Sequence, residues 1–248
     1  MVKRLLGIAA LLCLLATAAG AGVLDNAVIK VGTESTYPPY ESRDDKNNLV
    51  GFDIEMTEAI ASKLGKKVEW VDMPFDSLIP ALLSKKIDLI AAGMSATAER
   101  AKKVAFSTPY EISMSAFLVK ADNNALKTLA DMKGKTVATQ LGTVQETFSK
   151  TIEGVTVKAF QKFDDCAREV SLGRVDATLM DIPVAKKFVE QKDFAGKIKI
   201  AFEQEITGAG KALAMNLDDK AFVAAIDKAL DEMKASGELD KMKAKWFK

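Results

Sequence analysis

The chain has no histidine among its 248 residues. A histidine general base, a Ser-His-Asp triad and every metal site with histidine ligands are therefore excluded, whereas carboxylate, lysine and cysteine chemistry remain available. The chain also lacks an excess of charge of either sign, because 35 Lys and Arg residues face 34 Asp and Glu residues, a formal net charge of +1. Since binding to nucleic acid depends largely on positive charge, we expect no nucleic-acid partner.

Cysteine is scarce as well, with only Cys13 and Cys166. Cys13 lies inside an expected export signal, so the mature chain would keep Cys166 alone. An intramolecular disulfide is then impossible, although an exported protein would meet conditions that permit one. We interpret Cys166 as a small buried hydrophobic residue. The alternative is a reactive or intermolecular thiol.

Residues 1–22 are typical of an export signal. Lys3 and Arg4 provide the positive start, residues 5–15 form an apolar core, and residues 16–21 offer small side chains for cleavage. The alternative is an uncleaved membrane anchor, but the Ala- and Gly-rich end would make a poor lipid-facing helix. We therefore expect a cleaved signal peptide, an exported mature protein and no later membrane span.

The remaining chain alternates short β-rich runs with helical stretches, an order typical of α/β folds with mainly parallel sheets. The expected strands are residues 29–32, 67–71, 87–91, 113–120, 136–139, 155–159, 177–180, 198–202 and 211–216. The expected helices are residues 54–64, 77–84, 144–150, 164–172 and 183–191. A further helix is predicted by Phe222, Ile226, Leu230 and Met233, which repeat at helical spacing and should be followed by a stop at Gly237.

Two stretches of the chain repeat one pattern. In residues 86–93 a basic residue, an apolar residue and an aspartate precede an apolar run that leads to Gly93. Residues 174–181 have the same arrangement and end at Asp181. Ligands of open α/β sheets bind beyond the carboxyl ends of the strands. Gly93 and Asp181 are therefore predicted to face one cleft from two similar lobes.

Four segments together resemble a known family: residues 31–41 (VGTESTYPPYE), 51–64 (GFDIEMTEAIASKL), 75–82 (FDSLIPAL) and 93–100 (GMSATAER). In this order and spacing they are similar to the polar amino-acid-binding proteins among the periplasmic solute-binding proteins, which deliver ligands to ATP-driven importers. The resemblance continues through Leu141-Gly142-Thr143 and Asp181 to the C-terminal helices, so it covers nearly the whole mature chain.

The resemblance implies an α/β, two-lobed periplasmic-binding-protein-like (type II) fold with a paired-strand hinge. Lobe 1 would be residues 23–112 plus 207–248, and lobe 2 residues 113–206. The implied function is a non-enzymatic receptor that captures a polar L-amino acid, with a basic residue or glutamine favoured, and passes it to an inner-membrane ABC permease. A monomer without cofactor or metal is expected.

Arg100 matches the arginine that binds the ligand carboxylate in this family, and its planar fork suits two carboxylate oxygens. The backbone amides near Ser95 and Thr143 are implied to join it. The alternatives are a solvated helix arginine and simple helix capping. Asp181 matches the aspartate that binds the ligand ammonium, helped by the Ser95 hydroxyl and the Gly93 carbonyl, although Asp181 could merely cap the following helix. Met94, between Gly93 and Ser95, completes this group.

Tyr37 and Phe52 match two aromatic residues that sandwich the aliphatic part of the ligand, although an aromatic residue is by default part of a core. Glu34 matches an acidic position that contacts the far end of the ligand side chain, and the alternative is an exposed glutamate at a strand end. Tyr110 and Gln145 are candidates for supporting groups behind these residues.

An enzyme on the same scaffold, such as a cyclohexadienyl dehydratase, is the main competing function. It would need an acid or base aimed at its substrate, and Glu34 is the candidate. The pair Arg100 and Asp181 instead suits a zwitterion, whereas a cyclohexadienyl diacid has no ammonium group. The sensing domain of a receptor is a third possibility, but we expect no membrane helix or signalling domain after Lys248.

Overall fold

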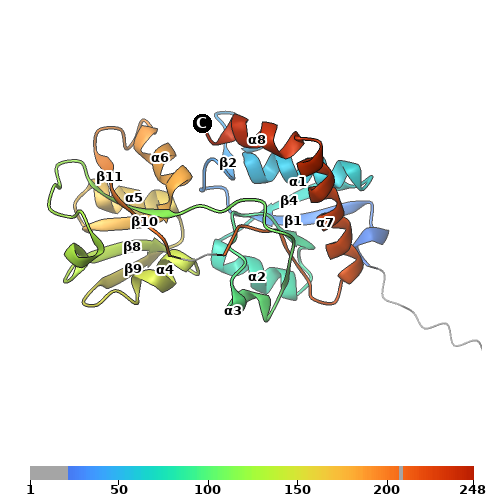
Figure 1. Cartoon of the computed structure of the whole chain (residues 1–248), viewed down its shortest axis with the longest axis horizontal. Helices are drawn as coiled ribbons and strands as arrows, with labels where there is room; N and C mark the ends of the chain where they lie inside the picture. Colours follow the sequence, from blue (N-terminus) through green and yellow to red (C-terminus); the bar gives the residue numbers. More distant parts are fainter. Residues whose placement is uncertain (1–21, 207–208) are drawn as a thin grey trace, which may run out of the picture.

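The computed structural model describes residues 22–206 and 209–248, which form two lobes that lie next to each other (Figure 1). Each lobe is built on a five-stranded sheet, and a small two-stranded sheet of β2 (Ser42–Arg43) and β3 (Leu49–Val50) belongs to the first lobe. The expected signal peptide, apart from Gly22, lies outside the described residues, as do residues 207 and 208 at the predicted lobe boundary.

The sheet of the first lobe has the strand order β4-β1-β5-β12-β6. Its strands are β1 (Val28–Thr33), β4 (Lys67–Asp72), β5 (Leu89–Ile90), β6 (Ala105–Phe106) and β12 (Ala214–Met215). β1 runs parallel to β4 and β5, whereas β12 is antiparallel to β5 and β6. The carboxyl ends of β1 and β5 therefore lie at the same edge, where Glu34 and the segment that leads to Gly93 follow.

The helices of the first lobe are α1 (Phe52–Lys63), α2 (Phe75–Leu83), α3 (Ala98–Ala101), α7 (Lys220–Ala235) and α8 (Glu238–Trp246). In α7 the four residues predicted from their spacing are all buried. Gly237 follows this helix with φ +72°, a left-handed conformation that glycine adopts without steric cost. The predicted stop at Gly237 is confirmed, but the chain then enters α8, which the sequence did not predict.

The sheet of the second lobe has the order β11-β7-β10-β8-β9. Its strands are β7 (Ser115–Lys120), β8 (Thr136–Gln140), β9 (Thr156–Phe160), β10 (Ala177–Asp181) and β11 (Ile198–Gln204), and its helices are α4 (Val144–Ser149), α5 (Phe163–Ser171) and α6 (Ile182–Glu190). Cys166 lies in α5 and is completely buried, and burial raises the pKa of its thiol far above the usual value.

The expected two-lobed α/β fold is confirmed, but both sheets are mixed and not mainly parallel. In the second lobe β8 is parallel to β9 and β10, whereas β7 is antiparallel to β10 and β11. The physical reason lies in the crossings between the lobes. Strands β7 and β12 enter their sheets from the other lobe and run antiparallel to the neighbouring strands of the local βα units, β10 and β5.

Two connections join the lobes, one between β6 and β7 and one between β11 and β12, the second described except for residues 207 and 208 (Figure 1). The predicted crossing at Ser113 falls in the first connection. The two connections are paired with each other, because Glu111 forms a bridge with Lys211 and Ser115 lies opposite Gln204. This pairing is the geometry expected of a paired-strand hinge.

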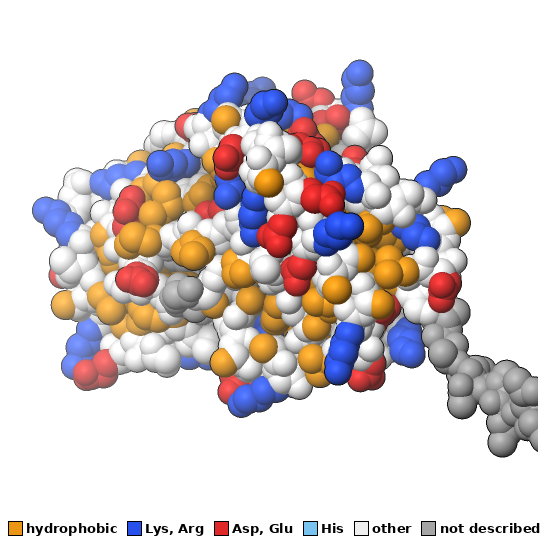
Figure 2. All heavy atoms as spheres, turned by 45° about the vertical axis from the view of Figure 1, so that its right-hand side comes forward, with side chains coloured by type: hydrophobic (Ala, Val, Ile, Leu, Met, Phe, Trp, Pro, Cys, Tyr) orange, Lys and Arg blue, Asp and Glu red, His pale blue; other side chains and the backbone are white. Residues whose placement is uncertain are grey.

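No helix within the described ranges is long and apolar enough to cross a membrane. On the face shown in Figure 2, Lys and Arg side chains are interspersed with Asp and Glu, in keeping with the nearly balanced composition.

Candidate functional site

A cavity lies where the two lobes meet, at the carboxyl ends of β1, β8 and β10. It is lined by Glu34, Tyr37, Glu41, Phe75, Ala92, Gly93, Ser95, Arg100, Gln140, Thr143, Val144, Gln145, Phe163 and Asp181. The structure thus brings together most of the residues predicted to bind a ligand. Phe52 and Met94 are the predicted residues that do not line it.

Direct contacts join the lobes across this cavity. The Tyr37 hydroxyl donates to Asp181 Oδ2 over 2.6 Å. Gln140 Nε2 donates to Glu34 Oε2 over 2.8 Å. Arg100 donates to the carbonyl oxygen of Gly142 over 3.0 Å. Each contact joins a first-lobe side chain to β8, to the residues that follow it, or to the end of β10. Hydrogen bonds between the lobes therefore surround the cavity.

Arg100 has a half-buried positive charge that forms no ion pair with any carboxylate of the described residues. Its guanidinium donates to the carbonyl oxygens of Ser95, over 2.8 Å, and Gly142, and it lies 5.3 Å from the centre of the Phe75 ring. Burial lowers the pKa of Arg100 to about 10. A desolvated guanidinium bonded to two uncharged carbonyls can gain a bidentate anion as a further partner, since it carries five N–H donors.

Thr143 lies on the opposite wall and caps α4. Its hydroxyl accepts from the amide of Glu146 over 3.2 Å and donates to the carbonyl oxygen of Gln140 over 2.7 Å. The capping alternative is therefore correct for this side chain, which nevertheless lines the cavity. Capping fixes the start of α4 against the end of β8.

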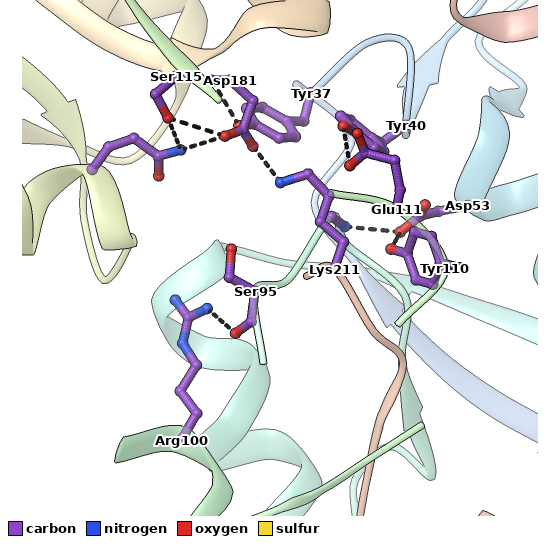
Figure 3. Close-up of polar contacts among 12 residues, drawn as sticks. Tyr37, Tyr40, Asp53, Ser95, Arg100, Tyr110, Glu111, Ser115, Asp181 and Lys211 are labelled. Carbon is purple, nitrogen blue, oxygen red and sulfur yellow. Dashed lines mark hydrogen bonds and ion pairs between the residues drawn. The ribbon is translucent and has the colours of Figure 1, made fainter. Parts of the chain in front are cut away.

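Asp181 is the centre of a buried polar cluster (Figure 3). Its Oδ2 accepts from Tyr37 and from the Lys211 ammonium, and its Oδ1 accepts from Ser115 Oγ and Gln145 Nε2, each over 3.1 Å. The side chains of Lys211 and Asp181 are 4% and 6% exposed. Gln145 thus has the supporting role that the sequence suggested, but Lys211 was not predicted.

Two further carboxylates, Glu34 and Glu41, face the cavity. Glu34 follows β1, is 4% exposed and accepts from Thr36 and Gln140. Burial raises the pKa of Glu34 from 4.5 to about 7. Glu41 is 1% exposed, and its Oε2 has no hydrogen-bond partner among the described residues. Burial, together with the nearby Asp53 carboxylate, raises the pKa of Glu41 well above its usual value. This part of the cavity favours a ligand group that brings positive charge or donors.

Aromatic rings form the walls between the charged groups. Tyr37 stacks on Phe163 of the second lobe, with ring centres 4.7 Å apart, and on Tyr40 behind it, at 5.6 Å. Phe75 at the start of α2 lines the cavity as well. The cavity therefore has apolar surfaces that can hold the aliphatic part of a ligand.

Phe52 and Met94 lie outside the cavity. Phe52 is completely buried and packs between Tyr110 and Phe247, with ring centres 5.7 and 5.1 Å away. It is a core residue, so the structure does not support a place for Phe52 in an aromatic sandwich, and Phe75 lies at the cavity instead. Met94 is 1% exposed and packs in the core beneath α2.

Gly93 brings the loop after β5 close to Tyr37. It has φ +53°, and a Cβ atom there would lie 3.1 Å from the Tyr37 ring. Its amide donates to Asp53 Oδ2 over 2.8 Å, and the Tyr110 hydroxyl donates to the same oxygen over 2.6 Å. Asp53 thus positions Gly93, and Tyr110 is a supporting group as expected. Burial raises the pKa of Asp53 to about 6.

The cavity residues that the sequence did not single out had weak signals. Phe75 and Glu41 stand inside the segments that carry the family resemblance, so both could have been considered. Phe163 opens α5 one residue before the predicted helix, and Gln140 ends β8 one residue after the predicted strand. Within the described residues no group of Cys, Asp and Glu is arranged to hold a metal ion.

The fold and the site define a class of protein. Two α/β lobes on a double-stranded hinge enclose a cavity with a guanidinium on one wall, carboxylates on the others and aromatic faces between them. This is a two-lobed binding protein for a small charged solute.

Comparison with known sequences identifies the family. The chain belongs to the bacterial extracellular solute-binding proteins, family 3, whose sequence pattern matches residues 29–248. It is 37% identical over 220 residues to the arginine-binding extracellular protein ArtP of Bacillus subtilis (strain 168), a match that covers 88% of this chain and 85% of that protein. It is 34% identical to the lysine/arginine/ornithine-binding periplasmic protein of Escherichia coli (strain K12), covering 94% and 92%.

Solved structures agree with this assignment. An ancestral arginine-binding protein bound to arginine superposes with a TM-score of 0.86 at 43% identity, covering 90% of this chain and 99% of that one. The predicted family membership is thus confirmed, and these relatives are binding proteins.

Proposed function

We propose that this protein is an exported receptor that captures an L-amino acid with a cationic or amide side chain between its lobes and delivers it to an ABC importer. The observation that supports this best is the charge pattern of one cavity. A half-buried guanidinium that pairs with no carboxylate of the described residues lies on one wall, and buried carboxylates lie on the others.

The assignment of ligand groups follows the charges. The ligand carboxylate binds Arg100, and the α-ammonium approaches the wall that holds Asp181. The aliphatic part packs on Tyr37 and Phe75, and the distal donors reach Glu34. A carboxylate left unpaired in such a place is costly, so a side chain without donors is disfavoured.

The names of the relatives support a basic ligand. The two relatives described above bind arginine, or lysine, arginine and ornithine, according to their names. Glutamine remains a weaker candidate, because its amide can donate to Glu34 without supplying charge.

The remaining assignments are also part of the proposal. Residues 1–22 are a cleaved signal peptide, residues 23–112 with 207–248 form one moving lobe, and residues 113–206 form the other. The protein acts as a periplasmic monomer whose partner is an inner-membrane permease, without nucleic acid and without a cofactor.

A thermal-shift screen of the twenty amino acids and ornithine tests this function. A ligand at about 100 times its dissociation constant stabilises the folded state by about 2.7 kcal/mol. We expect the largest shifts with arginine, lysine and ornithine, a smaller one with glutamine, and none with leucine or glutamate. Equal shifts with leucine or glutamate would contradict the proposal. Recovery of the unchanged ligand after incubation, followed by NMR, separates a receptor from an enzyme.

A further inference from the structure

Lys211 is a buried lysine that nothing described so far requires. It lies in the second connection between the lobes, where its backbone forms two hydrogen bonds with the first connection. The Lys211 amide donates to the carbonyl oxygen of Glu111 over 2.7 Å, and the Tyr110 amide donates to the carbonyl oxygen of Lys211 over 2.9 Å. From this fixed position the side chain extends across to Asp181 of the second lobe (Figure 3).

The hydrogen bonds to Asp181 leave little room for another cation. A carboxylate offers about four lone-pair sites. Those of Asp181 receive Tyr37, Ser115, Gln145 and Lys211. A ligand α-ammonium can reach this carboxylate only if one of these donors moves away.

Lys211 is the donor that can move. Tyr37 is held by ring stacking against Tyr40 and Phe163, whereas the lysine ammonium sits at the end of a flexible four-carbon chain. Its positive charge also acts on Glu41 and Glu111, whose pKa values it lowers against the effect of burial. After leaving Asp181, the Lys211 ammonium would still be close to carboxylates, so exchange of one ammonium for another changes the electrostatic energy little.

We propose that Lys211 supplies the cation that Asp181 requires, so that the cavity binds a carboxylate with a distal cation whether or not the ligand carries an α-ammonium group. The inference rests on the proposed function and deepens it by widening the ligand class to ω-amino and ω-guanidino carboxylates. In a site whose aspartate depends on the ligand for its counter-charge, losing the ammonium lowers affinity by roughly 30-fold to several thousand-fold. Here Lys211 stays on Asp181 when the ligand has no ammonium there.

The experiment compares each amino acid with its analogue that lacks only the α-amino group. Calorimetry on the mature protein measures lysine against ε-aminocaproate, and arginine against δ-guanidinovalerate. We expect each analogue to bind within about tenfold of its amino acid. A loss greater than tenfold overturns the inference and leaves the proposed function intact. If neither the amino acids nor the analogues bind, both fall.

Variants test whether Lys211 is the reason that the analogues bind nearly as tightly as the amino acids. In Lys211→Met the amino acid can still neutralise Asp181 and the analogue cannot, so the ratio of the two affinities rises to roughly 30-fold or more. Lys120→Met is the matched control, because it removes the same charge from an exposed side chain that pairs with Asp122, and its ratio stays as in the wild type. An unchanged ratio in Lys211→Met overturns the inference.

A second variant keeps the test decisive if Lys211→Met does not fold. In Lys211→Gln an uncharged donor replaces the ammonium beside Asp181, so the ratio of the affinities for amino acid and analogue should rise as in Lys211→Met. An unchanged ratio in this variant overturns the inference as well.

Discussion

Arg100 and Glu34 are two charged residues that line the cavity on different walls. Arg100 is bonded to uncharged carbonyl oxygens, and Glu34 is bonded to a hydroxyl and an amide. Among the described residues neither has an oppositely charged side chain in contact, so each can pair with a charged ligand group. A desolvated charge without a partner destabilises the protein. Replacement of Arg100 or Glu34 should therefore change a measurable quantity, the ligand affinity or the free energy of unfolding.

Arg100→Ala should weaken binding of the amino acid by roughly 2–5 kcal/mol, because the ligand carboxylate loses a desolvated partner. Calorimetry gives the dissociation constants of the variant and the wild type. Arg174→Ala is the control, since Arg174 is 64% exposed and pairs only with Glu169 at the surface. A loss of less than about tenfold with an unchanged circular dichroism spectrum would show that Arg100 does not bind the carboxylate.

Glu34→Gln should change how stability depends on pH. The ordinary pKa of a glutamate is 4.5, and burial raises the pKa of Glu34 in the folded protein to about 7 because it disfavours the charge. Between these values the folded state binds more protons than the unfolded state, so Glu34 lowers the free energy of unfolding as the pH rises from about 4.5 to about 7. The variant lacks this loss. The free energy of unfolding of the variant relative to that of the wild type should therefore rise by up to about 3 kcal/mol between pH 4.5 and pH 8.

Urea unfolding at both pH values measures this difference between Glu34→Gln and the wild type. Glu69→Gln, which changes an exposed glutamate on β4, serves as the control. A difference between Glu34→Gln and the wild type that stays constant with pH would mean that Glu34 titrates as an exposed carboxylate.

Helices α1 and α2 begin alike, each with a phenylalanine followed by an aspartate. The two helices nevertheless use their first residue differently. Phe52 of α1 packs into the core against Phe247, next to the end of α8, whereas Phe75 of α2 lines the cavity next to Arg100. Loss of the ring should therefore have opposite consequences in the two helices.

Phe52→Ala should destabilise the protein by about 3–5 kcal/mol, the usual cost of removing a buried phenylalanine. Phe75→Ala should leave most of the stability and reduce ligand affinity instead, because the ligand loses an aromatic wall. Thermal unfolding and calorimetry on both variants separate the two effects. A Phe52→Ala protein of normal stability and much weaker ligand affinity would show that Phe52 belongs to the binding site.

The comparison of these two helices also shows how far the sequence could predict the structure. The order of strands and helices was predictable, because apolar residues repeat with clear periods in segments such as α7. In α8 only Leu239 and Met242 are buried among charged residues, so the periodic signal is too short. Whether Phe52 or Phe75 lines the cavity depends on which of them the C-terminal residues cover. The local sequence around each phenylalanine does not carry this information.

The site was predictable where its residues stand in segments with a family resemblance, as for Arg100 and Asp181. Lys211 could not be predicted, because a lysine at the start of a strand is ordinarily exposed. Only the pairing of the two connections puts its side chain beside an aspartate from the other lobe.

At the scale of the whole molecule, the two paired connections limit how the lobes can move. The described parts of the two connections are paired with each other, so we expect rotation of one lobe against the other as a hinge. The contacts across the cavity, such as Tyr37 with Asp181, are the ones that such a rotation breaks and restores.

Small-angle scattering should therefore give a smaller radius of gyration with saturating ligand than without it. The scattering curve at saturation should also match the curve calculated from this structure, because a bound ligand favours the arrangement in which both lobes contact it. Leucine serves as the control that leaves the curve unchanged. The same radius with and without a ligand that binds tightly would rule out a hinge motion on binding.

The position of β12 has a consequence for the order in which the protein can fold. β12 lies between β5 and β6, and α7 and α8 pack on α1, so the first lobe needs the last residues of the chain. The strands of the second sheet are contiguous in the chain and are complete once β11 has emerged. During synthesis or export from the N-terminus, the lobe that begins first is thus finished last. Until then its unfinished sheet exposes the apolar residues that α7 will cover, which is the interval in which a chaperone would have most to bind.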